Sequence, residues 1–131
     1  MYMKERQTRQ TNVPEFRARA AMIDRDVALV SVAGELDLYT ADSFALALED
    51  AIATRPAAVI VDLSATTFVD STALGVLVHR AKSLGRAQLA IVPGAAHAQR
   101  LFDVTGLARV YSIYSTLAAA IAACVAEPEA A

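Results

Sequence analysis

A short polar turn is the feature of this sequence best suited to chemistry. Asp70, Ser71 and Thr72 stand between an apolar segment and a predicted helix. Loops that follow the carboxyl ends of parallel strands are the usual place for sites in α/β folds. Ser71 is well suited to be the N-cap of this helix, with its hydroxyl accepting a backbone N–H. It is then either only a helix cap or part of a functional site in this loop.

Motifs of the common enzyme classes do not occur in the sequence. There is no phosphate loop, no dinucleotide-binding glycine fingerprint and no Gly-x-Ser-x-Gly elbow. His79 and His97 lack metal-ligand spacing and cysteine partners, and His97 is expected on a helix surface. His79 is a poor base for Ser71, because the intervening helix separates them by roughly 12 Å. We therefore expect no catalytic residue, no metal site and no cofactor.

The composition predicts a protein with a substantial core. Hydrophobic residues make up 56% of the 131 positions and charged residues 20%. The formal net charge of -2 gives no basic excess, so nucleic-acid binding is not expected. No apolar run reaches the roughly 18 residues of a membrane span, and the first residues lack a secretory signal. We expect a cytoplasmic protein without membrane insertion, in which Cys124, the single cysteine, is a small buried hydrophobe.

Hydrophobic periodicity predicts the element order ββαβαβαβα. After an opening hairpin the units are strand-helix-strand, so a single mostly parallel sheet with helical cover follows. The run at 57–63 is apolar without alternation, as in a strand covered on both faces. The expected strands are 15–22, 27–36, 57–63, 88–92 and 109–113, with 65–70 as a loop.

Caps and breakers delimit the predicted helices. Thr40 is a candidate N-cap for a helix that Pro56 stops, and Gly85 ends a helix over about 72–84. A short helix over 95–103 follows, and Ser115 or Thr116 caps an alanine-rich last helix. We expect one domain over 13–125, between a flexible polar tail at 1–12 and a second tail at 126–131.

A helical wheel assigns two faces to the helix over 72–84. One face is expected in the core and consists of Leu74, Leu77, Val78, Ala81 and Leu84. The opposite face carries Thr72, Val76, His79 and Ser83. Val76 is then an exposed apolar residue near Ser71 and a candidate contact for a partner protein.

Three segments resemble one known family. They are GELDLYTAD at 34–42, VIVDLSATTFVDSTALGVLV at 59–78 and RLFDVTGLARVY at 100–111. In this order they are similar to the STAS family, and above all to its bacterial anti-sigma factor antagonists. The likeness runs from about residue 15 to residue 124, and the three segments together are quite specific.

The resemblance implies a protein-binding switch. In that family the unphosphorylated antagonist binds an anti-sigma factor that is also a serine kinase with an ATP-binding fold, which frees the sigma factor. The kinase phosphorylates the antagonist and a phosphatase restores it. Ser71 is then the implied phosphoacceptor and Thr72 the alternative, while Asp37 and Asp70 are the implied acidic neighbours.

One position departs from the family pattern. Ala73 stands where the family often has glycine, and its methyl group is expected near the contact surface, where it would affect partner choice. The implied partner-binding residues are therefore Asp37, Asp70, Thr72, Ala73 and Val76. Two other roles remain open, both with constitutive binding: the STAS subunit of a membrane lipid-transport complex, or a subunit of a stress-signalling assembly.

Overall fold

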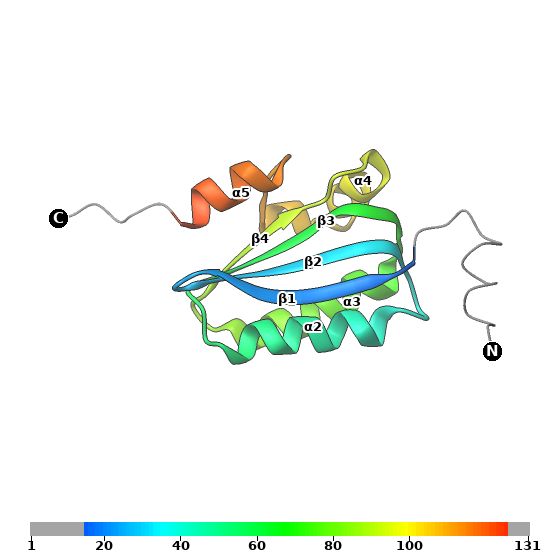
Figure 1. Ribbon diagram of the computed structural model, residues 1–131. Coiled ribbons are helices and arrows are strands. Elements are labelled where there is room, and N and C mark those ends of the chain that lie inside the picture. Colours follow the sequence, from blue (N-terminus) through cyan, green and yellow to red (C-terminus); the bar gives the residue numbers. More distant parts are fainter. Residues whose placement is uncertain (1–14, 126–131) are drawn as a thin grey trace, which may run out of the picture.

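The computed structural model describes residues 15–125, so the tails predicted at 1–12 and 126–131 lie outside the described residues. Figure 1 shows one sheet with helices on both of its faces. The strands are β1 (Arg17–Asp24), β2 (Val27–Leu36), β3 (Ala58–Val69), β4 (Gln88–Val92) and β5 (Ser112–Ile113). The helices are α2 (Ala41–Ala53), α3 (Ser71–Ala81), α4 (Ala96–Thr105) and α5 (Leu117–Cys124), with 3-10 turns η1 (Lys82–Leu84) and η2 (Leu107–Arg109). This order confirms the predicted ββαβαβαβα.

The strands lie in the sheet in chain order, β1-β2-β3-β4-β5. β1 pairs with β2 as an antiparallel hairpin, and β2 to β5 are parallel to one another. Parallel neighbours cannot be joined by a tight turn, so α2, α3 and α4 serve as the crossover connections. The mostly parallel sheet with helical cover is therefore confirmed, and the first strand lies two residues later than predicted.

Alternate residues of β3 point to opposite faces of the sheet and pack in two separate hydrophobic clusters. Val59 and Val61 pack with α2 and α3 on one face, in a cluster that also holds Phe102 of α4. Ala58 and Ile60 pack with α5 on the other face. Figure 1 shows α2 and α3 on one side of the sheet and α5 on the other. Burial on both faces explains why the predicted strand at 57–63 is apolar without alternation.

β3 is longer than the sequence predicted. The segment 65–69, expected as a loop, continues the strand and pairs with β2, from Ala33 opposite Ala65 to Leu36 opposite Val69. The pairing shifts register on the way, and beside the shift the Asp62 carboxylate accepts hydrogen bonds from the backbone N–H (3.0 Å) and hydroxyl (2.6 Å) of Ser64. Residues whose side chains hydrogen-bond to the nearby backbone are typical of turns. Because this segment contains such residues, hydrophobic periodicity did not predict that the strand continues through it.

The last strand is shorter than the predicted 109–113. Gly106 adopts a left-handed conformation, and the chain then forms η2, in which the N–H groups of Arg109 and Val110 bond the carbonyls of Gly106 and Leu107, both at 3.0 Å. These residues are therefore turned away from the sheet, and only Ser112 and Ile113 pair with β4.

Of the two threonines predicted to cap helices, one makes a capping hydrogen bond and the other does not. Thr116 caps α5 as expected, its hydroxyl accepting a hydrogen bond from the Ala119 N–H at 3.1 Å. Thr40 does precede α2, but its side chain makes no capping bond because it is used in the preceding turn. α2 ends at Ala53, shortly before Pro56.

Replacing Gly94 by alanine is predicted to destabilise the fold more than replacing Gly106. Both have positive φ, +79° and +83°, which costs alanine about 1–2 kcal/mol. At Gly94 the new Cβ would lie 2.5 Å from the Ser64 Cα, whereas at Gly106 it would meet nothing within 4 Å. Overpacking should therefore add roughly 1–3 kcal/mol at Gly94 alone. Urea unfolding measures both variants, and equal losses would contradict this close approach.

Candidate functional site

Two loops meet at the carboxyl end of the parallel strands. β2 runs into the turn that begins α2, and β3 runs into α3. The backbone N–H of Asp70 donates to the carbonyl of Leu36 at 3.1 Å, which joins the two loops. The structure therefore places the segment that contains Asp37 beside the one that contains Ser71.

Asp70, not Ser71, is the N-cap of α3. The backbone of Asp70 is extended (φ -112°, ψ 176°), and its carboxylate accepts a hydrogen bond from the Ala73 N–H at 3.1 Å. The prediction that Ser71 caps the helix is therefore wrong, because the preceding carboxylate already occupies the capping position. Ser71 becomes the first residue of the helix and is exposed. Within 15–125 no hydrogen bond engages its hydroxyl.

α3 is rotated relative to the helical-wheel prediction. Ala73 is fully buried in the core (0% exposed), so the expectation that its methyl group projects at a contact surface is wrong. Val76, expected to be exposed, is half-buried and packs against the same core, while Val78, expected in the core, is only half-buried. α2 packs against α3, and Arg80, one turn after Val76, forms an ion pair with Glu49 of α2 at 2.7 Å. Thr72 is exposed beside Ser71.

The carboxylate of Asp37 folds the turn between β2 and α2. Its Oδ1 accepts hydrogen bonds from the backbone N–H groups of Tyr39 (2.9 Å) and Thr40 (3.2 Å). In return the Thr40 hydroxyl accepts from the Asp37 N–H at 2.9 Å and donates to the Glu35 carbonyl at 2.8 Å. Asp37 thus has a local structural role, and its contact with a partner stays a prediction.

Exposed apolar side chains lie in or next to the two turns that contain Asp37 and Asp70. Leu38 is 62% exposed, Tyr39 90% and Phe68 45%. Phe68 stacks against His97 of α4 with a ring separation of 6.4 Å, so His97 is half-buried rather than on the open helix surface. Sequence reasoning missed Leu38 and Tyr39, although two apolar residues between a turn aspartate and a helix start were a readable signal.

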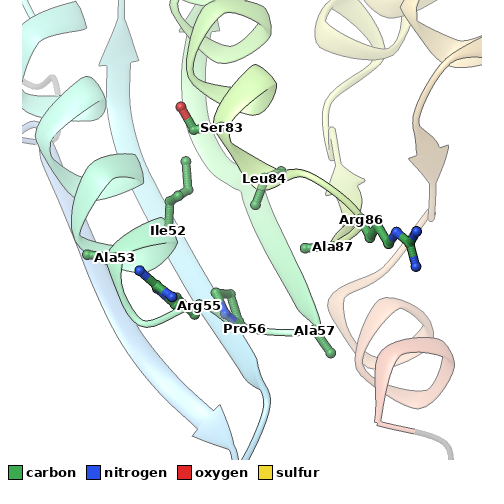
Figure 2. Close-up of a pocket in the computed structure, with 9 residues that line it drawn as sticks. All are labelled: Ile52, Ala53, Arg55, Pro56, Ala57, Ser83, Leu84, Arg86 and Ala87. Carbon is green, nitrogen blue, oxygen red and sulfur yellow. The ribbon is translucent and has the colours of Figure 1, made fainter.

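The most voluminous hollow described lies at the other end of the sheet. It measures about 890 Å³ and is open, between the end of α2 and the turn after α3. Figure 2 shows Arg55 and Arg86 at its two sides, with their guanidinium groups pointing away from each other. The polar groups do not converge on a common point, so the hollow offers no constellation for binding or catalysis.

The remaining titratable groups do not form a reactive centre. Burial raises the pKa of the Cys124 thiol, which keeps the nucleophilic thiolate scarce at neutral pH. Cys124, predicted to be a small buried hydrophobe, is only half-buried; it is the last residue of α5 and packs against the core on that face of the sheet. Burial also raises the pKa of Tyr111.

Over residues 15–125, no three His, Cys, Asp or Glu side chains are grouped as metal ligands would be. No helix in the same part of the chain has the length and apolarity to cross a membrane.

The sequence model of the STAS domain matches residues 18–120. The chain belongs to the STAS domain family. It is 32% identical over 92 residues to the anti-sigma-F factor antagonist RsfB of Mycobacterium tuberculosis, covering 70% of this chain and 75% of the relative. It is 37% identical over 92 residues to an anti-sigma-B factor antagonist of Listeria monocytogenes, covering 69% and 81%. These names describe regulators and not enzymes.

Solved structures give the same fold. An anti-sigma factor antagonist from Mycobacterium paratuberculosis superposes with a TM-score of 0.73 at 29% identity, covering 84% of this chain and 94% of its own. The unphosphorylated form of SpoIIAA superposes with a TM-score of 0.69, covering 82% and 95%, and at 19% identity this likeness concerns the fold alone. The predicted STAS fold is therefore confirmed.

Removing the carboxylate of Asp70 is predicted to destabilise the protein, whereas removing the hydroxyl of Ser71 is not. Asp70→Ala should cost about 0.5–2 kcal/mol through loss of the cap, and Asp70→Asn should retain most of it. Ser71→Ala should stay within about 0.5 kcal/mol of wild type. Thermal or urea unfolding measures all three. A loss for Ser71→Ala as large as that for Asp70→Ala would return the capping role to Ser71.

Proposed function

We propose that this chain is a cytoplasmic anti-sigma factor antagonist, a binding protein that phosphorylation at Ser71 switches off. The observation that carries the proposal is the exposed Ser71 hydroxyl on the first residue of α3, free because Asp70 caps the helix in its place. An exposed hydroxyl that makes no hydrogen bond within the described residues is accessible to a modifying enzyme. Thr72, exposed next to it, is the alternative acceptor.

The relatives support the class of partner. RsfB and the Listeria relative are named for antagonism of an anti-sigma factor, and each aligns over about two thirds of this chain. SpoIIAA has been solved in a phosphorylated as well as an unphosphorylated form. We therefore propose an anti-sigma factor with an ATP-binding serine kinase fold as the partner, and a phosphatase that restores the hydroxyl.

A phosphate on Ser71 should leave the fold intact. It adds about -1.5 to -2 charges at the first turn of α3, where the helix dipole favours an anion by roughly 0.3–2 kcal/mol. The switch must therefore act through the partner surface. The loop joined to the one that holds Ser71 exposes the apolar Leu38 and Tyr39, the end of β3 exposes Phe68, and Asp70 beside the serine is acidic.

The same charge would oppose binding of the partner. A buried charge without a counter-charge costs on the order of several kcal/mol, and about 1.4 kcal/mol is a tenfold change in affinity. A phosphate buried beside the apolar residues would have to be compensated by a cation that the unmodified complex does not need. Phosphorylation should therefore lower the affinity about a hundredfold or more.

Ser71→Glu is predicted to lose the anti-sigma factor that the wild-type chain binds. Pull-down from native lysate identifies the retained ATP-binding protein, and titration calorimetry with the purified proteins measures the loss, expected at about a hundredfold. Ser83→Glu is the matched control, since Ser83 is exposed in η1, beyond the far end of α3, and should bind as wild type. Incubation with ATP and the purified anti-sigma factor kinase should transfer one phosphate to wild type and none to Ser71→Ala. If wild type and Ser71→Glu retain the same transport ATPase, the proposal is wrong and the chain is a transport-complex subunit.

Tyr39→Ala is predicted to weaken partner binding without loss of stability. The side chain is 90% exposed in the free protein, so its removal should change the free energy of unfolding by less than about 0.5 kcal/mol. A tyrosine buried at an interface commonly contributes about 2 kcal/mol, so the affinity should fall roughly tenfold or more. Val110→Ala is the control, because Val110 is 67% exposed but lies beyond α4. Unchanged affinity for Tyr39→Ala would remove this residue from the interface.

A further inference from the structure

One half of the sheet has no helical cover on the face that carries α5. α5 packs on β3 and β4. Of the helices within residues 15–125, α2 is the one that packs extensively against β1 and β2, and it lies on the opposite face (Figure 1). β1 and β2 therefore present an open strip beside α5. Two adjacent strands occupy about 10 Å, and a helix is about 10–12 Å in diameter, so the strip has the width of one helix.

The open strip combines two arginines with small residues. Arg17 of β1 lies opposite Ala33 of β2, and Arg19 lies opposite Ser31. Both arginines are exposed, and they border a hollow of about 380 Å³ on the sheet surface. Its lining includes Arg17, Arg19, Ser31, Ala33, Asp62 and Ala65. Because the residues beside the arginines are small, a helix can approach the sheet closely here.

Neither arginine of the open strip has an ion-pair partner in the described part of the chain. The ion pair found there joins Arg80 to Glu49, both outside the strip. The carboxylate that lines the hollow, Asp62, instead accepts hydrogen bonds from the backbone N–H and the hydroxyl of Ser64. The strip therefore offers two positive charges to an acidic partner.

The outer face of α2 has the complementary properties. Leu46 is 61% exposed in the middle of this helix. Asp42 and Asp50 lie one turn before and one turn after it on the same face, and both are exposed. Asp50 stands in the last turn of α2, where the helix dipole favours cations instead. The helix thus presents an apolar side chain between two carboxylates, one of which the helix itself does not stabilise.

We propose that the open strip binds α2 of a second copy of this chain. Leu46 of one copy then lies over the small residues of the strip, and the carboxylates of its α2 lie at Arg17 and Arg19 of the other copy. Because α2 lies over β1, the edge strand, its flank away from α3 meets no other described element. That flank leaves room for α5 of the other copy.

The two surfaces lie on opposite faces of the sheet, so one molecule can use both at the same time. The contact is heterologous, and copies add head to tail instead of closing as a symmetric dimer. The mass of the assembly should therefore rise with concentration beyond that of a dimer. Neither surface includes Ser71, so this association does not depend on the proposed function.

Sedimentation velocity of the wild-type chain, up to about 1 mM protein, measures the association. Low salt should strengthen it and high salt should weaken it, because the contact joins opposite charges. A strip variant, Arg17→Glu with Arg19→Glu, should weaken association by about tenfold or more. An α2 variant, Leu46→Lys with Asp50→Lys, should do the same. The four positions are exposed, so urea unfolding should show both variants folded.

An equimolar mixture of the two variants is the decisive measurement. The strip variant keeps an intact α2 and the α2 variant keeps an intact strip, so together they should form one contact and stop at a dimer. As a control, Arg86→Glu with Arg100→Glu makes the same change in net charge at exposed positions elsewhere and should associate as wild type.

A wild-type chain that stays monomeric, or a mixture that does, would overturn the inference. The strip would then be left to another occupant, either the acidic segment 126–131 or a different protein. A wild-type assembly that stops at a dimer would also contradict head-to-tail contact. Because these measurements use this chain alone, without an anti-sigma factor, their failure would leave the proposed function untouched.

Discussion

The parallel pairing of β2 with β3 determines where everything else in the molecule lies. It runs from Val27 opposite Ala58 to Leu36 opposite Val69, so both strands end at the same edge of the sheet. The two loops that follow are joined by the hydrogen bond from the Asp70 N–H to the Leu36 carbonyl. Had β3 ended at Leu63, as periodicity indicated, Ser71 would follow a free loop. The additional pairing of residues 65–69 with β2 gives Ser71 a fixed position.

The two acidic residues of the site have parallel structural roles. Asp37 holds the start of the turn before α2 through the N–H groups of Tyr39 and Thr40, and Asp70 holds the start of α3 through that of Ala73. Each carboxylate satisfies backbone donors that would otherwise have no partner at a helix or turn start. The hydroxyl of Ser71 is left out of this bonding. An acidic residue before the serine is thus explained by local structure, without any direct role in a reaction.

The sequence was sufficient for the element order, the mostly parallel sheet and the location of the site, because these depend on periodicity and on turn residues. Among the details that were missed, some depended on local hydrogen bonds and others on tertiary contacts. The end of β3 pairs with β2 beyond a register shift, beside which Asp62 and Ser64 form hydrogen bonds inside a hydroxyl-rich segment. The capping of α3 required a choice between two adjacent residues that both cap helices well. Ala73 is buried and Val78 half-buried because of how α3 packs against neighbouring elements, α2 among them. A helical wheel uses the sequence of α3 alone, so it could not predict this rotation.

The strand order has a consequence for how the chain reaches this structure. Because every strand pairs with the one that precedes it in sequence, no pairing has to wait for a distant segment. Loop closure before each parallel pairing spans one crossover only, so its entropic cost is smaller than that of a pairing between strands far apart in sequence. A chain that emerges from the ribosome amino end first can add each strand to an edge already present. The loops around Ser71 are complete once α3 has formed, before the carboxyl-terminal third is made.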